Sequence, residues 1–140
     1  MKVVFDTNVY ISAFVIPGGN AEKAYLHAVD GDFERYTSIA ILTELAGKLE
    51  VKFGWEKMKI VQLIHSISNL ATVLRTVPWL HGVPDEPDNR ILECAIKAGA
   101  AFVVTGDKHL LKLRNYEHLE IIRLSTFLAI LQKLPASPPH

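Results

Sequence analysis

The chain has 140 residues, of which 49% are hydrophobic and 21% charged. This length is typical of one domain that buries about 68% of its unfolded surface, and the composition excludes a disordered, collagenous or low-complexity protein. The 15 Lys and Arg residues balance the 15 Asp and Glu residues, so a polyanion would have to be held by a local patch rather than by net charge.

Cysteine content and hydropathy bear on the compartment and on partners. The single cysteine, Cys94, cannot form an internal disulfide, which favours a reducing compartment, and we expect the cytoplasm. No apolar run approaches the ~20 residues that span a bilayer, and the N-terminus lacks the features of a signal peptide, so we expect no membrane association. The mean hydropathy of +0.19 is high for a small monomer, which suggests that another chain covers some apolar surface.

Short strands and amphipathic helices alternate in the first half of the chain. The apolar run from Lys2 to Phe5 predicts a strand, and Asp6-Thr7-Asn8 after it are residue types that begin helices. Apolar residues then recur at helical spacing as far as Pro17. The same patterns predict a helix from an Asn20 cap to about residue 29, a helix from a Ser38 cap to about residue 54, a helix over 55–70, and strands over 33–37 and 72–77.

The second half begins with a turn-rich loop, Pro78 to Pro87, and continues with a helix from Asp88 to near Gly99. We expect a strand over 101–105, a short helix over 108–113, a strand over 119–123, a helix capped by Ser125, and a disordered tail over 135–140. Strands that alternate with helices and lack hairpin signals predict one α/β domain over 1–134. Its expected architecture is three layers, α/β/α, around a parallel sheet of four or five strands.

Four of the six aspartates lie at junctions between predicted elements. Asp6 ends the first strand, Asp107 follows the fourth, and Asp85 and Asp88 stand where the turn-rich loop enters a helix. Ligands of parallel sheets bind in the crevice beyond the carboxyl ends of the strands, which is where Asp6 and Asp107 are expected. Asp88 shares its helical face with apolar residues, and Glu44 lies near the margin of an apolar stripe, so neither occupies a fully solvated position.

Converging carboxylates require a cation, because two of them ~5 Å apart repel each other by ~3 kcal/mol at an effective dielectric of ~20. A set of oxygen ligands without histidine or cysteine suits Mg²⁺ or Mn²⁺ rather than zinc. Such an ion can lower the pKa of a bound water and neutralise a leaving oxygen, which indicates phosphodiester hydrolysis.

Each residue also has a purely structural interpretation. Asp6 and Asp88 could cap helices, Glu44 could pair with Lys48 one turn later, and Asp85 could be a turn residue. The six histidines lack metal-ligand spacing, and Cys94 is expected to be a packed thiol.

Four motifs in this order resemble the PIN-domain ribonucleases, and in particular the VapC-type toxins of bacterial and archaeal toxin-antitoxin modules. The motifs are Asp6-Thr7-Asn8 after a hydrophobic strand, Leu42-Thr43-Glu44-Leu45, Pro87-Asp88-Asn89-Arg90 with Leu92-Glu93-Cys94-Ala95, and Val104-Thr105-Gly106-Asp107-Lys108. The resemblance covers nearly the whole chain. It implies a parallel sheet flanked by helices and a cleft of three or four carboxylates that holds Mg²⁺ or Mn²⁺ and cuts RNA.

The resemblance assigns the catalytic carboxylates to Asp6, Glu44, Asp88 and Asp107. Asp6, Asp88 and Asp107 are expected to coordinate the ion, and Glu44 to complete the cage or orient the attacking water. Supporting residues around them are expected to be Asn8, Thr105, Asp85 and Glu93. Candidates for RNA contact are Lys48, Arg90, Lys108 and Lys112, each of which could equally be a solvated helix charge.

The hypothesis from the sequence is therefore a metal-dependent endoribonuclease, with an RNA substrate, a small antitoxin partner and a homodimeric state. A PIN-fold module that binds RNA or protein without cleavage, and an RNA-processing nuclease outside toxin-antitoxin systems, are the alternatives. A haloacid-dehalogenase phosphatase is excluded, because Asn8 stands where its second Asp is required and Leu111 where a later one is. A two-component receiver is excluded because Phe5-Asp6 supplies only one acid.

Overall fold

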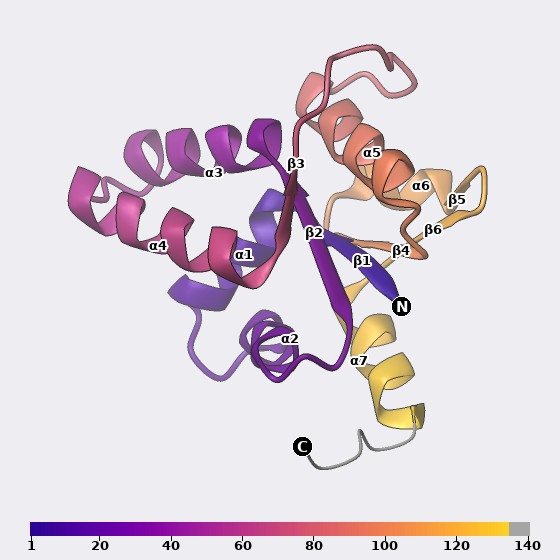
Figure 1. The fold of residues 1–140 in the computed structure, drawn as a ribbon, viewed down its shortest axis with the longest axis horizontal. Helices are drawn as coiled ribbons and strands as arrows, with labels where there is room; N and C mark the ends of the chain where they lie inside the picture. Colours follow the sequence, from indigo (N-terminus) through magenta and orange to yellow (C-terminus); the bar gives the residue numbers. More distant parts are fainter. Residues whose placement is uncertain (135–140) are drawn as a thin grey trace.

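The computed structural model describes residues 1–134, in which strands and helices alternate along most of the chain (Figure 1). The strands are β1 (Lys2–Phe5), β2 (Glu34–Ser38), β3 (Thr72–Leu74), β4 (Phe102–Val104), β5 (Asn115–Tyr116) and β6 (Leu119–Ile122). The helices are α1 (Thr7–Val15), α2 (Asn20–Val29), α3 (Ile39–Val51), α4 (Lys57–Leu70), α5 (Glu86–Ala98), α6 (Lys108–Leu113) and α7 (Leu124–Lys133). The predicted tail over 135–140 lies outside the described residues.

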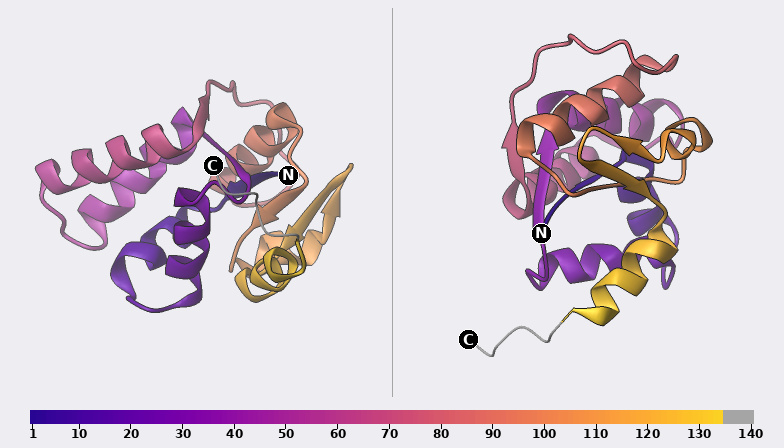
Figure 2. Two further views of the ribbon diagram at one scale, coloured as in Figure 1. Left: turned by 60° about the horizontal axis from the view of Figure 1, so that its bottom comes forward. Right: turned by 90° about the vertical axis from the view of Figure 1, so that its right-hand side faces the viewer.

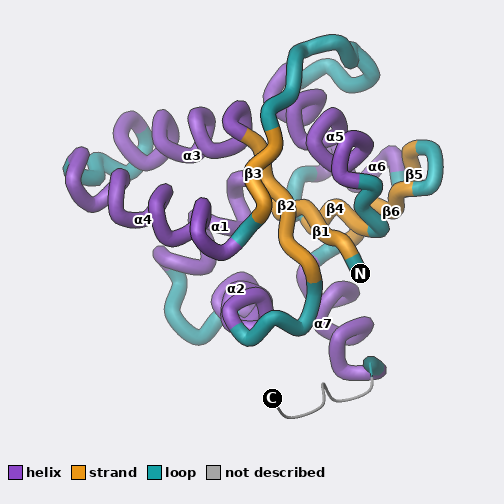
Figure 3. The backbone as a smooth tube through the Cα atoms, viewed as in Figure 1, coloured by secondary structure: helices purple, strands orange, loops and turns teal. Residues whose placement is uncertain are grey.

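The strands form one six-stranded sheet in the order β3-β2-β1-β4-β6-β5, which runs through the middle of the molecule (Figure 3). Five strands are parallel, and only β5 pairs antiparallel with its neighbour β6. The prediction of a parallel α/β sheet of four or five strands is therefore confirmed. The additional strand, β5, has two residues, which is too short for its alternation to be recognised in a sequence.

Helices cover both faces of the sheet, as the two views in Figure 2 show. Val3 and Phe5 point to a core shared with α1, α2, α3, α4 and α7, whereas Val4 points to a second core shared with α5 and α6. This division follows from the two-residue period of a strand, which sends successive side chains to opposite faces. The expected three layers are present, and no helix within residues 1–134 is long and apolar enough to cross a bilayer.

Several predicted boundaries shift by a few residues. Asn20 and Ser125 do not cap their helices: Gly19 and Arg123 hold the capping positions, and neither helix start has a capping bond from a side chain. Ser38 does cap α3, because its hydroxyl accepts the Ile41 N–H at 3.2 Å. The third strand ends at Leu74 rather than Val77, since its only partner strand, β2, ends at Ser38 opposite Leu74.

The loop over residues 75–85 is anchored on α5. Glu93 is 1% exposed, and its Oε2 accepts the backbone N–H groups of Trp79 and Leu80, both at 2.7 Å. Arg90 balances this buried charge, with its Nε 2.8 Å from Glu93 Oε1. Asn89 both donates to and accepts from the backbone of Val83. These bonds fix the first turns of α5 at the carboxyl end of the sheet.

Replacing Glu93 tests this anchor. We expect Glu93→Gln to lower the free energy of unfolding by about 3 kcal/mol, because Arg90 loses its buried partner charge. The matched control is Glu86→Gln, which removes an exposed carboxylate 3.4 Å from the same guanidinium and should cost about 0.5 kcal/mol. Urea unfolding measures both. Equal losses in the two variants would contradict the assigned role of Glu93.

Candidate metal centre

Asp6 lies immediately after β1 and is only 4% exposed. It caps α1, since its Oδ1 accepts the Asn8 N–H at 3.4 Å, and its Oδ2 accepts the Thr105 hydroxyl at 2.7 Å. Burial raises the pKa of Asp6, and the hydrogen bonds from Thr105 and Asn8 oppose part of that rise. Asp6 therefore combines the structural capping role with a buried, polar environment typical of functional carboxylates.

Thr105 joins the ends of two adjacent strands. Phe5 of β1 pairs with Val104 of β4, so the residues that follow them lie side by side. The Thr105 hydroxyl donates to Asp6 and accepts the Asp107 N–H at 3.0 Å. Asp107 then begins α6, because its Oδ1 accepts the N–H groups of His109 and Leu110 at 2.8 and 3.0 Å. The predicted proximity of the two strand ends is thus produced by the parallel register.

Asp88 lies in the first turn of α5, with 5% of its surface exposed. Its Oδ2 is buried and has no hydrogen-bond partner among residues 1–134. The pKa of Asp88 is raised to about 7, first by burial and then by the negative charges of four other carboxylates, which are Asp107, Asp85, Asp6 and Glu44. Three of these four belong to the predicted catalytic set, so the fold brings them close enough for their charges to act on Asp88. We call Asp6, Glu44, Asp88 and Asp107 the carboxylate cluster.

Glu44 enters the cluster from α3. Its Oε2 accepts the Thr7 hydroxyl at 3.3 Å, and its Oε1 lies 3.0 Å from Lys48 Nζ. Lys48 Nζ also donates to Asn8 Oδ1 at 3.4 Å, and its positive charge lowers the pKa of Asp6. The ion pair between Glu44 and Lys48 that the sequence suggested is present. Glu44 nevertheless belongs to the cluster, because its charge still raises the pKa of Asp88.

The cluster has the chemistry of a site for a hard divalent cation. Its donors are carboxylate oxygens, and the unpartnered Asp88 oxygen lacks the positive partner that a buried carboxylate needs. Within residues 1–134, no three Asp, Glu, His or Cys side chains converge closely enough to enclose an ion by themselves. Mg²⁺ is often held by one or two carboxylates together with water and phosphate, so an open arrangement of this kind fits it. Asp6, Asp88 and Asp107 remain the predicted ligands of such an ion, directly or through water.

The remaining predicted residues divide between the cluster and the loop anchor. Asp85 is exposed but close enough to raise the pKa of Asp88. Glu93 and Arg90 contact each other and the loop over 75–85, so the contacts they make serve that anchor. Lys108 and Lys112 are exposed on α6, beyond Asp107.

Sequence reasoning assigned no site role to Thr7 or to Asn89. Thr7 is buried and donates to Glu44, and Asn89 is buried against Val83 beside Asp88. Both are short polar residues next to a predicted carboxylate near a helix start, and this position is the signal by which the sequence could have identified them. Their partners belong to other elements, so the bonds themselves were not readable from the sequence.

The PIN domain family matches residues 2–109, which include all four predicted catalytic carboxylates. The chain is 32% identical over 120 residues to the uncharacterized protein MJ1680 of Methanocaldococcus jannaschii, a match that covers 82% of this chain and 76% of that protein.

Two crystal structures share the fold. VapBC2 from Rickettsia felis, bound to a DNA fragment from its promoter, aligns with a TM-score of 0.61 at 14% identity, over 88% of this chain and 98% of that one. PAE2754 from Pyrobaculum aerophilum aligns with a TM-score of 0.61 at 17% identity, over 95% of this chain and 90% of that one. The family match spans the two strand ends and both helices that build the carboxylate cluster, and from it we conclude that this chain belongs to the PIN-domain family.

Proposed function

We propose that this protein is a metal-dependent endoribonuclease that hydrolyses RNA phosphodiester bonds. The observation that carries the proposal is the environment of Asp88, a buried carboxylate with an unpartnered oxygen and a pKa raised to about 7 by burial and by four neighbouring acids. Such crowding destabilises a protein unless a bound cation compensates it. Membership of the PIN-domain family supports a nuclease and hence a hydrolase.

In this proposal the residues around the cluster orient the carboxylates. Thr105 holds Asp6 through Oδ2 and the Asn8 N–H holds it through Oδ1, which fixes the orientation of the carboxylate, and each oxygen keeps a second lone pair for a ligand. Thr7 and Lys48 hold Glu44 on α3, where its carboxylate is placed to orient a water or to accept its proton. Bound Mg²⁺ or Mn²⁺ would supply charge neutralisation at phosphorus and a more acidic water. Preorganised ligands of this kind lower the cost of binding both ion and substrate.

We further infer that the chain acts as the toxin of a toxin-antitoxin pair, with a small antitoxin and a second copy of itself as partners. The structure from Rickettsia felis contains VapBC2, whose fold this chain shares. Exposed apolar side chains on or next to the outer helices offer surface for a partner, among them Ile16 at 56%, Leu26 at 53% and Met58 at 68% exposure.

Cleavage of a mixed RNA pool in Mn²⁺, Mg²⁺ or EDTA tests the nuclease. We expect the wild-type protein to cut RNA with either ion and not in EDTA, and Asp6→Asn to reduce cleavage by at least about 100-fold, because it removes one ligand charge. The matched control is Asp30→Asn at the exposed end of α2, which should cut at the wild-type rate. RNA binding without cleavage under every metal condition would favour the non-cleaving module.

The titration of Asp88 predicts a pH dependence of stability. Its folded-state pKa of about 7 lies above the ordinary value of 3.8, so the folded protein binds more protons than the unfolded chain between these values. The free energy of unfolding of the metal-free protein should therefore fall as pH rises from about 4 to 7. Asp88→Asn should remove this part of the slope and gain about 1–3 kcal/mol at pH 8, with little gain near pH 4.

Thermal and urea unfolding of both proteins between pH 4 and pH 8 measure the effect. Added Mn²⁺ should stabilise the wild-type protein at pH 8 and stabilise Asp88→Asn less, because a ligand that binds only the folded state raises its stability. A wild-type profile that is flat from pH 4 to pH 8 would contradict the crowding of acids around Asp88.

A further inference from the structure

Four cationic side chains gather around a hollow beside α6. Lys108, Lys112, Arg114 and Arg123 line it together with Leu111, and its volume is about 520 Å³. They come from α6, from the residue that ends it, and from the residue that precedes α7, so segments well separated in sequence build one surface. Among residues 1–134, no carboxylate lines this cationic hollow. A chain with no net charge thus concentrates positive charge at one place.

The four cationic side chains of the hollow form no ion pairs within residues 1–134. None of the four cations lies within 4.0 Å of an Asp or Glu carboxylate in the described part of the chain. The two other predicted RNA contacts differ, since Lys48 pairs with Glu44 and Arg90 with Glu86 and Glu93. The charge of the cationic hollow therefore remains available to an anion.

Arg114 reaches the hollow at a conformational cost. Its φ of 57° is unusual for a residue with a side chain and typically costs about 1–3 kcal/mol. Two backbone bonds hold it there, because Arg114 N–H donates to the Leu111 carbonyl and the Arg114 carbonyl accepts the Ile121 N–H. Glycine would avoid this cost, whereas this position carries a long cationic side chain that lines the hollow.

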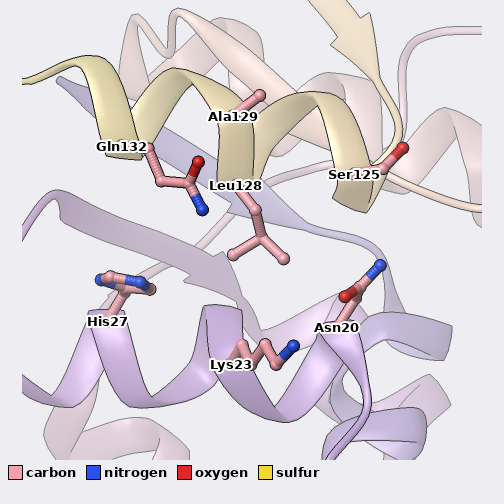
Figure 4. Close-up of a pocket in the computed structure, with 7 residues that line it drawn as sticks. All are labelled: Asn20, Lys23, His27, Ser125, Leu128, Ala129 and Gln132. Carbon is pink, nitrogen blue, oxygen red and sulfur yellow. The ribbon is translucent and has the colours of Figure 1, made fainter.

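A second hollow extends from these cations to Thr105 and Gly106, the two residues that precede Asp107. Its volume is about 340 Å³, and it shares Lys108, Leu111 and Arg123 with the cationic hollow. It also reaches Thr105, whose hydroxyl is bonded to Asp6. At its other side it is lined by Asn20 and Ser125, which lie at one end of the pocket of about 310 Å³ between α2 and α7 in Figure 4. The two hollows adjoin at Lys108, Leu111 and Arg123, and we call them together the groove, which extends from Thr105 to Arg114.

We propose that this groove binds the sugar-phosphate backbone of RNA on one side of the bond that is cleaved at the carboxylate cluster. The inference rests on the proposed function. Arg and Lys side chains along a groove hold successive phosphates without reading bases, and they position the strand. A phosphodiester chain suits both ends of the groove, because phosphate is also the ligand that completes a carboxylate-bound Mg²⁺. An acidic peptide has the charge for the cationic end but lacks the phosphate that such a site takes.

The test compares two double variants of equal charge. Lys112→Glu with Arg123→Glu reverses two charges of the cationic hollow, and Lys52→Glu with Lys57→Glu reverses two exposed charges at the turn between α3 and α4, far from α6 in Figure 1. Binding of a labelled single-stranded RNA 12-mer of mixed sequence is measured in EDTA, so that cleavage plays no part. A Lys112→Gln and Arg123→Gln variant and the melting temperature of each protein control for folding.

We expect the Lys112→Glu with Arg123→Glu variant, which we call the hollow variant, to weaken RNA binding about tenfold or more. It should also flatten the slope of log K against log salt by about 1.4, which is the value for two lost phosphate contacts on a single strand. The control variant should weaken binding less than about twofold. Equal losses in both variants, or none in the hollow variant, would overturn the inference. So would equally tight, groove-dependent binding of polyglutamate, which would assign the groove to an acidic protein segment.

The two proposals fail separately in this design. Groove-dependent RNA binding by a wild-type protein that never cuts RNA would refute the nuclease and support the groove as an RNA site. Metal-dependent cleavage with unchanged RNA binding by the hollow variant would refute the groove alone.

Discussion

Repulsion among buried carboxylates is the constraint on which the rest of the structure depends. Asp88 is the acid whose ionisation is most opposed, since burial and four neighbouring acids all raise its pKa. The surrounding fold fixes these acids in place through bonds to groups on other strands and helices. Thr105 bridges Asp6 to the start of α6, and Thr7 and Lys48 hold Glu44. The free energy that these bonds contribute maintains an arrangement that the charges alone would disperse.

Two buried acids on α5 show the difference between a structural and a chemical carboxylate. Glu93 accepts two backbone N–H groups and faces Arg90, so its charge is compensated within the protein. Asp88, one and a half turns earlier, has an oxygen with no partner in the described residues. The two residues lie on the same helix, and they differ in the groups that each carboxylate contacts. By fixing the loop over 75–85, Glu93 also keeps the start of the helix, and hence Asp88, in position.

Much of this arrangement could be predicted from the sequence. The alternation of elements gave the parallel sheet, and the positions of Asp6 and Asp107 after strands gave one edge of the cluster, because parallel strands bring their carboxyl ends together. Glu93 could not be separated from the site residues, since its partners are backbone groups of a loop. Arg114 and Arg123 were not predicted, because they line one hollow only when the residue that ends α6 lies beside β6. Local pattern identifies residues at junctions, whereas contacts between distant segments need the fold.

The two edge strands of the sheet pair in different directions, but both are short. The edge strand β3 has three residues and β5 has two, and β5 folds back antiparallel on β6. Long exposed edges invite other chains to add strands, and short edges prevent it. The sheet therefore offers little backbone for augmentation by another protein. Within residues 1–134, the side chains of the outer helices offer a partner more surface than the sheet edges do, so recognition through them depends on shape and surface composition and can diverge without disturbing the sheet.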